Sequence, residues 1–87
     1  MSRLITAAER LEKARQLMQT ARDLPIPEGM AWADFSYAAE IKDLMRQGRE
    51  LIKFIPYTSG LTAETKEEAK LVAQEIDRTE KELLHRG

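Results

Sequence analysis

Residues 34–56 read DFSYAAEIKDLMRQGRELIKFIP, and this stretch decides the fold class. Its apolar side chains recur three or four residues apart, which predicts a helix with one broad apolar face. Asp34 is a good cap for the first turn, and Pro56 cannot continue a helix, so we expect this helix at about 35–55. The apolar face is centred near Gly48 and consists of Tyr37, Ile41, Leu44, Met45, Leu51, Ile52 and Ile55.

The same helical spacing appears on both sides of this segment. We expect a preceding helix at about 6–24, capped by Thr6 and stopped by Pro25, and a following helix at about 63–85. The apolar face of the first is formed by Ala7, Leu11, Ala14, Met18 and Ala21. The face of the third is narrower and includes two polar positions, and it consists of Thr65, Ala69, Val72, Ile76, Thr79 and Leu83.

Three helices of similar length joined by short connectors predict an all-α, antiparallel three-helix bundle that forms a single domain over residues 1–87. The core of so small a domain supplies only about 3–5 kcal/mol of net stability. Docking onto a second copy would add to this stability, so we expect the bundle to self-associate.

Composition limits the classes of function. Fourteen Lys and Arg against fifteen Asp and Glu leave a net charge of −1, which gives no overall attraction to nucleic acid or to an anionic membrane. The chain has no cysteine, which suits a cytoplasmic protein. It also lacks a signal-peptide pattern and any apolar run of the roughly 18 residues that a membrane-spanning helix needs, so we expect no membrane association.

Four apolar residues fall away from the three core-facing seams. If Leu17, Leu24, Phe54 and Leu71 are exposed, they are candidates for an interface with another protein chain, including a second copy. The alternative is that Leu24 and Phe54, which lie close to prolines, cover the ends of the bundle.

A stripe of four cations is the most pointed polar feature: Lys42, Arg46, Arg49 and Lys53 are spaced to lie on one side of the middle helix, away from its apolar face. The stripe could be solvated or paired with acids across the bundle, or it could bind an acidic protein or nucleic-acid phosphates. The candidate acids on the third helix are Glu64, Glu68, Glu75 and Glu82.

Three further positions carry structural expectations. Gly48 in mid-helix predicts the close approach of a neighbouring helix backbone. Thr65 and Thr79 in the third seam are expected to bond back to their own helix. Trp32 is expected to cover one end of the bundle.

Catalysis has little support, because His85 is the only histidine and no phosphate-binding loop is present. We expect no cofactor, metal or small-molecule ligand. The sequence thus favours a non-catalytic helical interaction or regulatory module that self-associates; the alternative is a nucleic-acid-binding accessory protein that uses the basic stripe.

Overall fold

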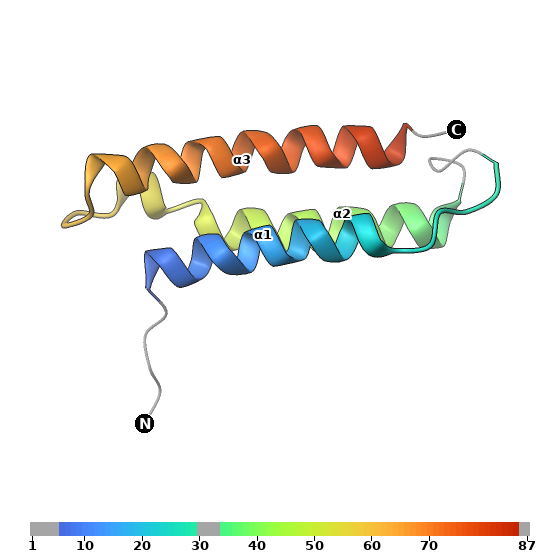
Figure 1. Cartoon of the computed structure of the whole chain (residues 1–87), viewed down its shortest axis with the longest axis horizontal. Helices are drawn as coiled ribbons and strands as arrows, with labels where there is room; N and C mark the ends of the chain where they lie inside the picture. The colour runs from blue at the N-terminus through green and yellow to red at the C-terminus, as the bar shows by residue number, and fades with distance from the viewer. Residues whose placement is uncertain (1–5, 30–33, 86–87) are drawn as a thin grey trace, which may run out of the picture.

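The computed structural model describes residues 6–29 and 34–85, which form three α-helices and no strand. The helices are α1 (Ala7–Asp23), α2 (Phe35–Ile52) and α3 (Ala63–Leu84), and the short 3-10 helix η2 (Ile55–Tyr57) lies between α2 and α3. Successive helices run in opposite directions, and each packs against the other two (Figure 1). The predicted all-α three-helix bundle is confirmed. The expected position of Trp32 lies outside the described residues.

α1 and α2 begin directly after the predicted caps, Thr6 and Asp34. The side chain of Thr6 accepts a hydrogen bond from the Glu9 amide, and the Asp34 carboxylate accepts one from the Tyr37 amide at 2.9 Å. Thr62 caps α3 in the same way. These bonds satisfy amide donors that the first turn of a helix cannot pair internally.

The helix ends follow the prolines. Leu24, which precedes Pro25, is extended with ψ 142°, so α1 ends at Asp23. α2 ends at Ile52, three residues before the predicted end, because Pro56 has no amide to donate to the Ile52 carbonyl. The chain then tightens into η2, whose hydrogen bonds span three residues instead of four.

The core lies along the line where the three helices meet. Its buried side chains are those that the three predicted seams contain, apart from the half-buried Ala7, Thr65, Leu44 and Leu51. The buried hydrophobic residues are Leu11, Ala14, Met18, Ala21, Tyr37, Ile41, Met45, Ile52, Ile55, Ala69, Val72, Ile76 and Leu83.

Two expectations about the core need correction. Gly48 does face α3, but a side chain and not the backbone approaches it: a methyl group added at Gly48 would lie 3.2 Å from Cδ1 of Ile76. The buried Thr79 hydroxyl bonds across to α1 instead of back to its own helix. It accepts a hydrogen bond from Arg22 at 3.0 Å and donates to the sulfur of Met18 at 3.7 Å. The other seam threonine, Thr65, shares a 2.9 Å bond with the hydroxyl of the capping Thr62.

Candidate interaction surfaces

Leu17 and Phe54, two of the four candidate interface residues, line a groove between α1 and α2. The groove consists of two adjoining hollows that share Arg10, Glu50 and Leu51; the larger, with a volume of about 680 Å³, includes Leu17, and the smaller includes Phe54. We call both hollows together the α1–α2 groove. Its lining comes from α1, α2 and the turn that follows α2, and α3 contributes no residue to it.

Apolar surface is left uncovered in this groove. Leu17 and Leu51 are half-buried, and the Phe54 side chain is 66% exposed with the Lys53 ammonium 5.0 Å from its ring centroid. A cation at that distance interacts favourably with the ring, but it covers little of the apolar area. The exposure of Phe54 leaves most of its ring available to another chain, as the interface interpretation requires.

The other two candidate residues lie elsewhere. Leu24 is half-buried and packs against the core, which is the kind of placement that the bundle-end alternative expected. It does not line the groove. Leu71 is 50% exposed on α3 and also lies outside the groove. Leu71 follows Glu68 by three residues, so it lies near the edge of α3 that borders α1. The four residues therefore do not form one contiguous patch.

Ion pairs hold three of the four cations of the basic stripe. Arg46 pairs with Asp43 at 2.6 Å, and Lys53 pairs with Glu50 at 2.8 Å, both within α2 or its final turn. Lys42 forms no ion pair with the described part of the chain. The Arg46 and Lys53 pairs are local to α2 and do not cross the bundle, and they reduce the positive potential that a nucleic acid would meet.

Arg49, the fourth cation of the stripe, joins α2 to α3. Its guanidinium lies 2.8 Å from the Asp77 carboxylate and 3.4 Å from that of Glu80. Partial burial lowers the pKa of Arg49, but hydrogen bonds to both acids outweigh this effect and the net pKa is raised. The Arg49 guanidinium thus links α2 to two acids of α3.

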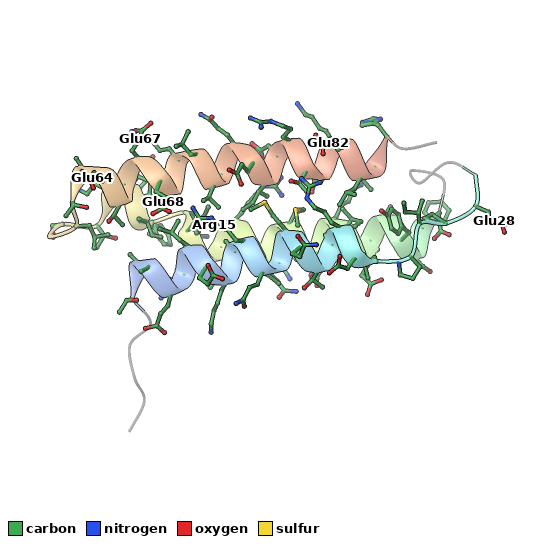
Figure 2. All side chains as sticks on the ribbon, in the orientation of Figure 1. Arg15, Glu28, Glu64, Glu67, Glu68 and Glu82 are labelled. Carbon is green, nitrogen blue, oxygen red and sulfur yellow. The ribbon has the colours of Figure 1, made fainter. Side chains whose placement is uncertain are left out.

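The acids that pair across the bundle differ from those expected. Glu68 and Glu82 pair with α1, through Arg15 at 2.6 Å and Arg22 at 3.5 Å, and not with the basic stripe. Figure 2 shows Arg15 and Glu68 pointing toward one another from the two helices. The spacing of these acids can be read from the sequence, but which neighbouring helix they face depends on how the helices pack.

The cations of α1 that line the groove were missed in the sequence. Arg10 donates to the Leu51 carbonyl at 3.4 Å, near the end of α2, where carbonyls lack partners within the helix. Lys13 lines the groove near Leu17 and forms no ion pair with the described residues. The helical spacing could have predicted this arrangement, because Arg10 and Lys13 precede Leu17 by seven and four residues, which places all three on one side of α1.

Comparisons of the chain with protein-family models, curated proteins and solved structures found no match. No helix in the described ranges is both long and apolar enough to cross a membrane. The same ranges contain no group of three or more His, Cys, Asp or Glu side chains placed to hold a metal ion.

Proposed function

We propose that this chain is a non-catalytic, cytoplasmic helical interaction or regulatory module that self-associates and acts through protein–protein contact. The observation that carries the proposal is the α1–α2 groove with its uncovered apolar side chains, above all Phe54. Contiguous exposed apolar surface that is rimmed by polar residues is typical of protein interfaces. The absence of cysteine from the sequence is compatible with the proposed compartment.

Residues of the groove resemble the parts of a protein interface. An aromatic ring with arginines close to it is the combination that most often contributes the largest share of binding energy at such surfaces. Phe54 and Arg10 line the same hollow, and Leu51 lies at its floor with partial burial. A partner that covers Phe54 would remove its exposed ring from water, which is a favourable hydrophobic contribution.

Sedimentation velocity over micromolar to submillimolar concentrations tests the proposal. We expect reversible, concentration-dependent association of the native chain, and we expect Phe54→Ala to weaken it about tenfold or more. Phe35→Ala is the matched control, because Phe35 is 89% exposed at the start of α2 but lines neither hollow of the groove.

Two results would contradict the proposal. One is a native chain that stays monomeric throughout the concentration range. The other is an equal loss of association in the Phe54 and Phe35 variants, which would show that exposed aromatic rings associate without regard to the groove.

A further inference from the structure

Near the edge of α3 that borders α1, an exposed leucine lies among acids. Leu71 follows Glu64 by seven residues and Glu67 by four, and it precedes Glu75 by four, so all four share one side of the helix. These three glutamates are exposed and form no ion pair with the described residues. Figure 2 shows Glu67 pointing away from α1. We call Leu71 with these three glutamates the Leu71 surface.

The α1–α2 groove has the opposite character. Arg10, Lys13 and Arg46 line its larger hollow against a single acid, Glu50, and the half-buried Leu17 lies among them. The groove therefore offers an apolar contact within a region of excess positive charge, and the Leu71 surface offers an apolar side chain within a region of negative charge. Surfaces of opposite charge around apolar contacts are complementary.

The lengths of the two surfaces also agree. From Arg10 to Thr20 the larger hollow of the groove follows eleven residues of α1, which is about 15 Å of helix, and Glu64 to Glu75 covers about 16 Å of α3. A groove-to-groove dimer would instead bring two positively charged surfaces together. Charge complementarity therefore favours α3 over a second groove as the occupant.

Within one copy these two surfaces cannot meet, because the groove is formed by α1, α2 and the turn after α2, with no residue from α3. We propose that copies of this chain associate head to tail, with the Leu71 surface of one copy seated in the α1–α2 groove of the next. This inference rests on the proposed self-association. A contact between two different surfaces leaves one of each free, so it produces rings or open chains instead of closed dimers.

Charge reversal on each surface tests this arrangement. The groove variant is Lys13→Glu with Gln16→Glu, and the α3 variant is Glu67→Lys with Glu75→Lys; all four positions are exposed. We expect each variant alone to associate at least about tenfold more weakly than the native chain in sedimentation velocity. An equimolar mixture should recover association, because each kind of surface then finds an oppositely charged partner.

A matched control carries two reversals, Asp23→Lys and Glu28→Lys, at exposed positions that line neither hollow of the groove. It should associate like the native chain, and circular dichroism should show all variants folded. If the α3 variant associates normally, or the mixture of variants stays monomeric, head-to-tail docking is wrong although self-association stands. If the native chain is monomeric, the proposed function fails with it.

Discussion

The contact between α1 and α2 differs in kind from the contacts that hold α3. α1 buries Leu and Met side chains and α2 buries Ile and Met side chains, and the hydrogen bond from Arg10 to the Leu51 carbonyl is the one polar side-chain link found between them in the described ranges. α3 buries large apolar side chains as well, including Ile76 and Leu83, but its seam also contains the polar Thr79. Its position is marked by ion pairs to both neighbours.

This difference separates the roles of the two kinds of interaction. Apolar burial is strong but weakly directional, so it holds helices together without choosing a unique register. Exposed ion pairs add only about 0–1 kcal/mol each, yet they oppose arrangements in which like charges meet. α3 has the narrower seam, and its acids pair with both α1 and α2. We therefore expect its stability to come from a few buried side chains and its register from charge.

The largest expected effect is in the seam of α3. Ile76→Ala removes a fully buried side chain and should lower the free energy of unfolding by about 2–5 kcal/mol, measured by urea denaturation at low protein concentration. Leu71→Ala, on the same helix but half-exposed, is the control and should cost well under half as much. If Ile76→Val, which leaves a smaller cavity, costs as much as Ile76→Ala, burial would not be the source of the effect.

A smaller effect tests the close approach at Gly48. Alanine there gains about 1 kcal/mol of helix propensity, but its methyl group would press on Cδ1 of Ile76 at 3.2 Å. Ile76→Val removes that atom. The loss of unfolding free energy caused by Ile76→Val should therefore be about 0.5–1 kcal/mol smaller when Gly48→Ala is also present. Urea denaturation of the two single variants and the double variant gives this coupling energy. Strictly additive effects would mean that the two positions do not touch.

The smallest effect compares two arginines of the basic stripe. Arg49→Gln breaks the link from α2 to Asp77 and Glu80 and should cost about 0.5–1 kcal/mol, decreasing as salt is added. Arg46→Gln breaks only an exposed pair within α2 and should cost less than Arg49→Gln. Equal losses in both variants would argue against a special role of ion pairs in holding α3.

The Arg46–Asp43 ion pair within α2 can be tested separately through the pKa of Asp43. Hydrogen bonds from Arg46 and Gln47, together with the charge of Arg46, hold the pKa of the Asp43 carboxyl below its ordinary value. A lowered pKa in the folded state stabilises the protein above the ordinary pKa, and this contribution is lost as pH falls through the folded value. NMR titration should therefore show a low Asp43 pKa that rises in Arg46→Gln. An unchanged pKa in that variant would rule out Arg46 as the main cause.

Local signals in the sequence were sufficient for much of the fold. The caps Thr6 and Asp34 and the breaker Pro25 act on the residues beside them, so the helix starts and the end of α1 could be predicted to within about one residue. Pro56 was also recognised, but its effect reaches back to the carbonyl four residues earlier, so α2 ends before the expected residue.

Helical spacing alone also determined which side chains face the core, since a period of 3.6 residues fixes the inward face once a helix forms. Only the tertiary structure decided which helix each outward face meets. It placed Leu17 and Phe54 in one groove and Leu71 outside it, and it assigned Glu68 and Glu82 to α1. These placements depend on how the packed helices are rotated and offset, and contacts between residues far apart in the chain set both.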